Sequence, residues 1–149
     1  MRLLPCLAIL AATASLAACV PQGGPTRAPH AILTDHGNRV DPTGNPGEFE
    51  VLARPGDGGA QLWCAAGEFA QSQLRASPDR RIYLVTPRGP SATRPGRTSA
   101  VFTVMPSPEL QARGDAMSNQ MLLGVRKVGT NFSTIHAYMV CRPPIDVPD

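Results

Sequence analysis

Two stretches near the middle of the chain have the clearest hydrophobic periodicity. Phe49 and Val51 alternate with Glu48 and Glu50, a pattern that predicts a short strand with one buried face. A turn-forming run over 55–59 follows, and its Asp57 is placed to cap the next element. From residue 60 to residue 76 there is no proline, and apolar residues recur at helical spacing: Leu62, Trp63, Ala66, Phe69, Ala70 and Leu74. The sequence therefore predicts a strand and then an amphipathic helix.

Three later runs rich in β-forming residues predict further strands, at 82–85, 100–105 and 122–128. The connection over 87–97 contains several prolines and glycines and predicts a long hairpin loop. The polar segment 107–120 predicts at most a short helical turn around 109–113. For the last segment, 133–141, two interpretations stay open. A helix capped by Ser133 is favoured, and a strand is the alternative.

The first 18 residues have the pattern of an export signal. One charge, on Arg2, precedes an uncharged run from Leu3 to Ala18. This run is shorter than the roughly twenty residues of a membrane-spanning helix, so we expect a segment that is removed. Residues 19–47 are interrupted by prolines at positions 21, 25, 29, 42 and 46, which predicts a flexible tether.

The segment Leu16-Ala17-Ala18-Cys19 places small residues and then a thiol directly behind the apolar run. In this the chain resembles the bacterial lipoprotein class, and the resemblance covers residues 1–19 alone. It implies cleavage before Cys19, lipids on the Cys19 thiol and amino group, and attachment to a membrane of the cell envelope facing the periplasm. Val20 rather than Asp follows the lipidated position, which favours the outer membrane over the inner one. The alternative is an ordinary secretory signal cut near Ala17 or Ala18.

The remaining cysteines fit an oxidising compartment. Cys6 leaves with the signal and Cys19 takes the lipid, which leaves Cys64 and Cys141 as a pair. We expect a disulfide between them. Two unpaired thiols, or a reactive Cys64 thiolate near a helix start, are the alternatives.

Together these elements predict a small two-layer α+β domain over 48–143, followed by a tail at 144–149. One main helix, and a short C-terminal helix or strand, lie on a sheet of three or four mostly antiparallel strands. One disulfide links the main helix, through Cys64, to the last element, through Cys141. No family can be named for it from the sequence.

Charge points to one candidate binding site. The chain without its first 18 residues loses only Arg2 from its 14 basic residues, against 11 acidic ones, a balance too slight to indicate nucleic-acid binding. Locally, however, the segment 75–97 has six arginines and only Asp79. Its members Arg81, Arg88, Arg94 and Arg97 are therefore candidate ligands for a phosphate or carboxylate group. The alternative is a solvated loop whose arginines serve solubility.

Catalytic chemistry is not indicated. No nucleophile motif, zinc motif or phosphate-binding loop is present. His30 and His36 fall in the predicted tether, and His136 is expected to be a surface or partly buried structural residue rather than a general base. Glu68 lacks an obvious partner, and Trp63 is expected in the core rather than stacked on a sugar. We therefore expect no enzyme, cofactor or metal. The favoured function is a non-catalytic, membrane-anchored envelope lipoprotein that contacts proteins or the cell wall. The alternative is a small-ligand or anion-binding module that uses the arginine-rich loop 80–97, and an enzyme of unknown type is the third possibility.

Overall fold

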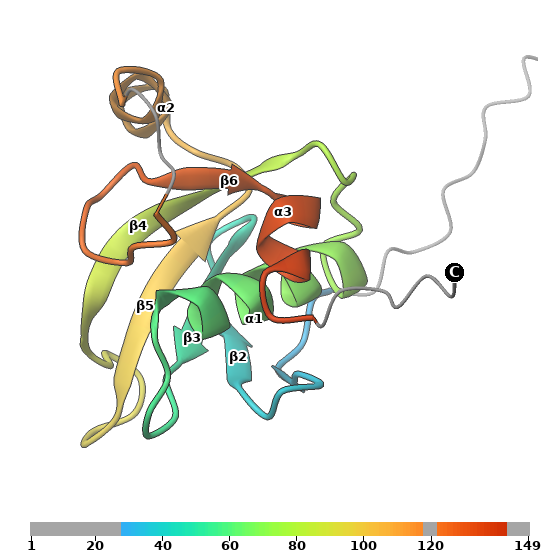
Figure 1. The fold of residues 1–149 in the computed structure, drawn as a ribbon, viewed down its shortest axis with the longest axis vertical. Helices are drawn as coiled ribbons and strands as arrows, with labels where there is room; N and C mark the ends of the chain where they lie inside the picture. Colours follow the sequence, from blue (N-terminus) through green and yellow to red (C-terminus); the bar gives the residue numbers. More distant parts are fainter. Residues whose placement is uncertain (1–27, 118–121, 143–149) are drawn as a thin grey trace, which may run out of the picture.

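The computed structural model describes residues 28–117 and 122–142, in which six strands pair into one antiparallel sheet (Figure 1). The strands are β1 (Ile32–Leu33), β2 (Arg39–Pro42), β3 (Glu48–Leu52), β4 (Arg81–Pro90), β5 (Thr98–Thr103) and β6 (Asn131–Ser133). Their order across the sheet is β1-β2-β3-β5-β4-β6. The helices are α1 (Gly59–Ser72), α2 (Pro108–Asp115) and α3 (Thr134–Met139). The predicted α+β class is confirmed, with more strands than expected.

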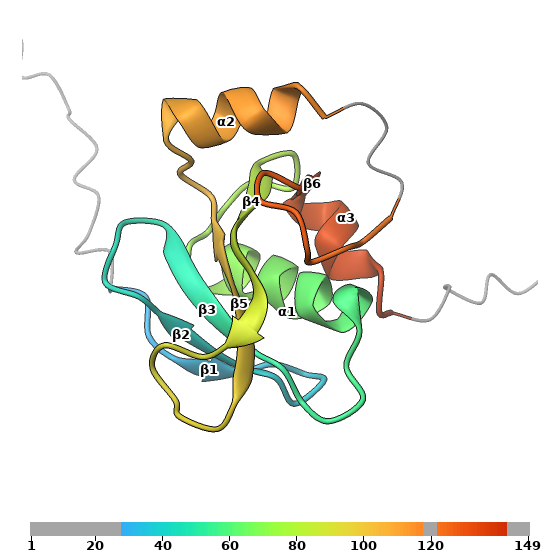
Figure 2. The ribbon, with the colours of Figure 1, turned by 90° about the vertical axis from the view of Figure 1, so that its left-hand side faces the viewer.

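Strand alternation creates one apolar face, which α1 and α3 cover. Phe49 of β3 pairs with Phe102 of β5, and both side chains are fully buried. The Phe49 ring lies 4.7 Å from the Phe69 ring of α1, measured between centroids, and the Trp63 ring lies 4.8 Å from the Phe102 ring. Figure 2 shows α1 and α3 together, with α2 apart at one end of the sheet. Trp63 is therefore a core residue, as predicted, and is not available to stack on a sugar.

The Cys64–Cys141 disulfide joins α1 to the turn that follows α3, with a Cα–Cα distance of 5.8 Å. This confirms the predicted pairing. The bridge closes a loop of 77 residues, which in the chain-entropy treatment contributes roughly 4 kcal/mol to stability. It therefore fixes the C-terminal element against the main helix.

The tether prediction for 19–47 was wrong over the part of that range that the structure describes. Val40 of β2 pairs with Val51 and is fully buried, so this segment adds two strands to the sheet. The buried Asn38 side chain donates to the Leu52 carbonyl at 3.2 Å and to the Asp57 carboxylate at 2.6 Å. Short strands in which one apolar residue is flanked by proline and charge leave little periodicity to detect. The signal 1–18, Cys19, the tether up to residue 27 and the tail 144–149 lie outside the described residues.

Four local predictions also need correction. Residues 87–90, predicted as part of the hairpin loop 87–97, belong to β4, so the loop is 91–97. Residues 122–128 do not form a strand, and the edge strand is instead β6, three residues long. The helical turn expected at 109–113 is the longer helix α2, capped by the Ser107 hydroxyl, which accepts from the Leu110 amide. Asp57 does not cap α1, because Gly58 occupies the N-cap position. The favoured helix near the C-terminus is confirmed as α3, with Ser133 as its cap.

Within the two described ranges, no helix has the length and apolar character needed to cross a membrane.

The close approach of α1 to α3 generates a stability prediction. A Cβ atom added at Gly67 would lie 2.4 Å from the Tyr138 backbone nitrogen, so Gly67→Ala must push the helices apart. Overpacking of this kind costs about 1–3 kcal/mol and outweighs the gain of up to about 1 kcal/mol that alanine brings to a helix. Urea unfolding should show the loss. Gly124→Ala, where nothing lies within 4 Å of the added atom, is the control, and a Gly67→Ala variant as stable as the parent would contradict this packing.

Candidate anion-binding cleft

The structure does not bring the four predicted arginines together. Arg81 donates to the Asn131 carbonyl at 3.0 Å and to the Asn131 side-chain oxygen. Arg94 forms an ion pair with Asp41 at 3.0 Å, and Arg97 is exposed at the end of its loop. Arg88 lines a cleft with two other cationic residues, whereas Arg81 lines a separate hollow with Arg80 and Asp79. The predicted site therefore does not exist as a single cluster.

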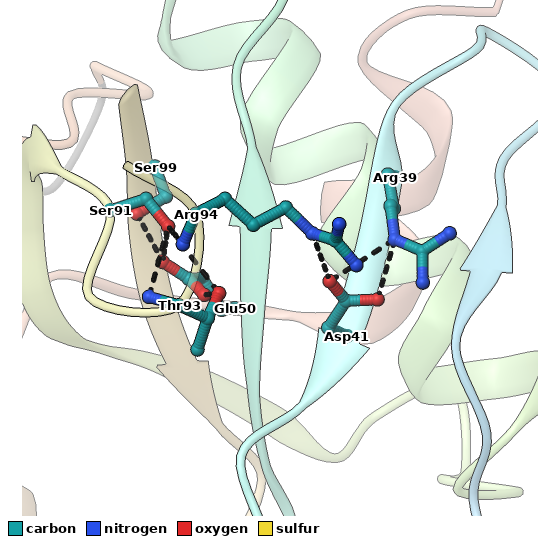
Figure 3. Close-up of polar contacts among 7 residues, drawn as sticks. All are labelled: Arg39, Asp41, Glu50, Ser91, Thr93, Arg94 and Ser99. Carbon is teal, nitrogen blue, oxygen red and sulfur yellow. Dashed lines mark hydrogen bonds and ion pairs between the residues drawn. The ribbon is translucent and has the colours of Figure 1, made fainter. Parts of the chain in front are cut away.

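The arginine-rich loop is instead fastened to the polar face of the sheet through Glu50 (Figure 3). This carboxylate is only 2% exposed, although it carries a charge. Its oxygens accept hydrogen bonds from one strand residue and three loop residues: the hydroxyls of Ser99, Thr93 and Ser91 and the backbone amide of Ala92. Burial raises the pKa of Glu50, but these four hydrogen bonds lower it by more, so the pKa lies below its ordinary value of 4.5.

A second contact fastens the same loop to β2. The Asp41 carboxylate lies between Arg94 of the loop, at 3.0 Å, and Arg39 of its own strand, at 2.8 Å (Figure 3). Both arginines are partly exposed, so each ion pair contributes little on its own. The ion pair matters more for anion binding than for stability. The Arg94 guanidinium already has a carboxylate partner and is not free to bind another anion.

Cationic side chains do converge at the first turn of α1. Arg88, Arg126 and Lys127 line a hollow of about 370 Å³, together with Gly58, Gly59, Leu123, Gly124, Val125 and Thr130. No carboxylate is among these described lining residues. Three positive charges without an internal counter-charge can bind a phosphate or carboxylate group by charge-assisted hydrogen bonds. We name this hollow the basic cleft.

The basic cleft is built by docking the segment 122–130 against α1 and β4. The Trp63 indole donates to the Gly124 carbonyl at 3.3 Å, and the Arg88 amide donates to the Val125 carbonyl at 2.8 Å. Gly59 allows the approach, because a Cβ there would lie 1.9 Å from the Leu123 carbonyl oxygen. The Arg88 guanidinium also donates to the Asp57 carbonyl oxygen, which holds it at the helix start.

The start of α1 adds favourable electrostatics to the basic cleft. No acidic residue lies in the first turn, and the N-cap Gly58 has no side chain to satisfy the amides there. The Asp57 carboxylate accepts from Asn38 and from the Arg54 amide instead. The helix dipole therefore reinforces the positive potential of the three side chains.

Sequence reasoning missed Arg126 and Lys127 because they fall inside the run interpreted as a strand. A usable signal was the pair of glycines, at positions 124 and 129, that brackets these two cations. Of the other candidates, the His136 ring stacks on Phe132 with 5.2 Å between centroids. Glu68 does have a partner, the Asp35 amide, at 3.0 Å. Cys19 lies outside the described residues.

Replacing Glu50 tests the loop anchor. Glu50→Gln should lower the free energy of unfolding at pH 7 by about 1–3 kcal/mol, because an amide cannot accept at both former oxygen positions. The folded-state pKa is lowered, so the carboxylate's contribution is complete above 4.5 and is lost as the pH falls through the folded-state value. The two proteins should therefore converge in acid, as measured by urea unfolding across pH. Glu48→Gln on the same strand is the control, and a pH-independent difference would refute the anchor.

No known protein family, curated protein or solved structure matches this chain. The basic cleft and the anchored loop are therefore interpreted from the chain's own residues and their geometry.

Proposed function

We propose that this chain is a non-catalytic lipoprotein of the cell envelope, held to a membrane by lipids on Cys19, whose domain binds anionic groups of the cell wall through the basic cleft. The observation that carries the binding role is the convergence of Arg88, Arg126 and Lys127 around a hollow with no carboxylate in its described lining. The membrane attachment in this proposal is derived from residues 1–19, and the binding surface is derived from the fold.

The disulfide supports the proposed location outside the cytoplasm. Bridges of this kind persist in oxidising compartments such as the periplasm and are rare in the cytoplasm. The Cys64–Cys141 pairing uses the two cysteines that remain once Cys6 leaves and Cys19 takes its lipids. Export and lipidation therefore account for all four cysteines of the chain.

The basic cleft supports an anionic ligand of modest size. Its volume of about 370 Å³ suits one charged head group rather than a whole polymer. All three of its cations are exposed to solvent, so a group that projects from a larger polymer can reach them. Peptidoglycan carboxylates have this form and are part of the cell wall. An acidic partner protein, the alternative, would present the same chemistry on a different carrier.

Neutralising the cleft tests the binding role. Arg126→Gln/Lys127→Gln should lower the amount of protein that sediments with purified peptidoglycan on the order of tenfold, because two charge-assisted contacts are lost. Binding by the parent should also weaken as salt rises, since screening acts on exposed charges. Arg80→Gln/Arg97→Gln removes the same charge outside the cleft and should bind as the parent does. Equal losses in both double variants would mean that net charge, and not the basic cleft, accounts for binding.

Replacing Cys19 tests the proposed lipid attachment to the membrane. Cys19→Ser removes the thiol that would carry the diacylglyceryl group, so the protein should leave the membrane fraction and show no acyl mass. The parent should begin at residue 19 with added acyl mass, as read by mass spectrometry of the membrane fraction. Cys6→Ser should leave the product unchanged. A parent protein that begins at Val20 or later without acyl mass would contradict lipidation.

A further inference from the structure

Three metal-ligating residues from three separate parts of the chain meet at the disulfide. One ligand atom from each of His36, Cys64 and Cys141 lies within 4.8 Å of the other two. Cys64 is buried, Cys141 is partly buried and His36 is exposed. The cluster is thus closed by the protein on the side of α1 and open to solvent on the side of the imidazole.

Neighbouring contacts hold the turn that carries His36 against both cysteines. Glu68 lies one helical turn after Cys64 and accepts from the Asp35 amide at 3.0 Å. Arg142, next to Cys141, forms an ion pair with Asp35, next to His36, at 3.1 Å. These contacts join the β1–β2 turn to α1 and to the end of α3, beside the three ligands.

The turn itself is also fixed. The Arg54 guanidinium donates to the His36 carbonyl oxygen, and the Gly37 amide donates to the Thr34 carbonyl at 2.8 Å. Gly37 has a φ of +79°, a conformation that most side chains disfavour, so glycine suits this position. The His36 imidazole therefore stands on an ordered turn and not on the flexible tether that its sequence context predicted.

We propose that the reduced form of this protein binds a thiophilic metal ion, with Zn²⁺ as the reference case, through Cys64, Cys141 and His36, and that forming the disulfide removes the site. Thiolate and imidazole are the ligands that Zn²⁺ takes in proteins, and three protein ligands leave a fourth position for water. The site shares no residue with the basic cleft, but it uses the two cysteines whose disulfide supports the proposed envelope location, so it exists only while that bridge is reduced.

The chemistry balances with one dithiol reductant. The dithiol gives two electrons and two protons to the disulfide, becomes a disulfide itself and leaves the Cys64 and Cys141 thiols. Zn²⁺ then binds both sulfurs as thiolates and releases those two protons to solvent, while neutral His36 donates a ring nitrogen. After reduction the two sulfurs must move from bonding distance to roughly 3.8 Å apart, the separation set by two Zn–S distances of about 2.3 Å in a tetrahedral site.

The test uses the full-length chain with Cys6→Ser and Cys19→Ser, so that Cys64 and Cys141 are its only cysteines. The probe is Co²⁺, added after reduction by a phosphine and removal of excess reductant. The reduced protein should bind one equivalent with a thiolate-to-cobalt charge-transfer band, and Zn²⁺ should displace it. The disulfide form should show no such band. Its absence from the reduced protein would overturn the proposal.

His36→Ala in the same background should weaken Zn²⁺ binding by at least about tenfold to 100-fold. Losses of that size are typical even for residues that only hydrogen-bond to a metal ligand. His30→Ala is the matched control and should bind as the background does. Circular dichroism follows folding after reduction. If reduction unfolds the chain and the thiols bind metal without the fold, the two histidine variants will have equal affinities, and that result also overturns the proposal.

Discussion

The packing of α1 against the sheet is the interaction on which the rest of this structure depends. Trp63 and Phe69 are fully buried against the phenylalanines of β3 and β5, so they fix the helix in position and direction. The first turn of that helix then forms one wall of the basic cleft. Cys64 from its middle anchors the C-terminal element, and Glu68 holds the β1–β2 turn. One core contact thus positions three separate surface features.

Elements with a strong local pattern were predictable from the sequence. The alternation around Phe49, the apolar face of α1 and the pairing of Cys64 with Cys141 are all as expected. β1 and β2 were not predictable in this way, because Val40 is the one residue of β2 in the core and its neighbours are proline and charged residues. β2 takes its place in the sheet by pairing with β3, and β1 by pairing with β2, which are tertiary effects.

The candidate site was only partly predictable, because charges that are close in sequence separate in space. The hairpin loop folds back on the sheet, where Glu50 and Asp41 hold it, and so Arg94 becomes a structural residue. Arg88 stands on the long strand β4, outside that loop, and meets two cations from a segment some forty residues away. The composition of 75–97 predicted an anion site within that segment, whereas two of the three cations that line the basic cleft come from 122–130. His36 was missed for a similar reason. Its proline-rich sequence context predicted a tether, and Cys64 and Cys141, which it approaches in the fold, are distant in the sequence.

We propose that anions bind at the basic cleft and not at the arginine-rich loop. The test is a titration of inorganic phosphate into ¹⁵N-labelled Cys19→Ser protein. NMR follows the chemical shift of each backbone amide. We expect saturable shifts confined to residues 58–61, 88 and 123–130, which line the cleft or flank it. Saturable shifts centred on 91–97, or no saturable shift anywhere, would contradict it.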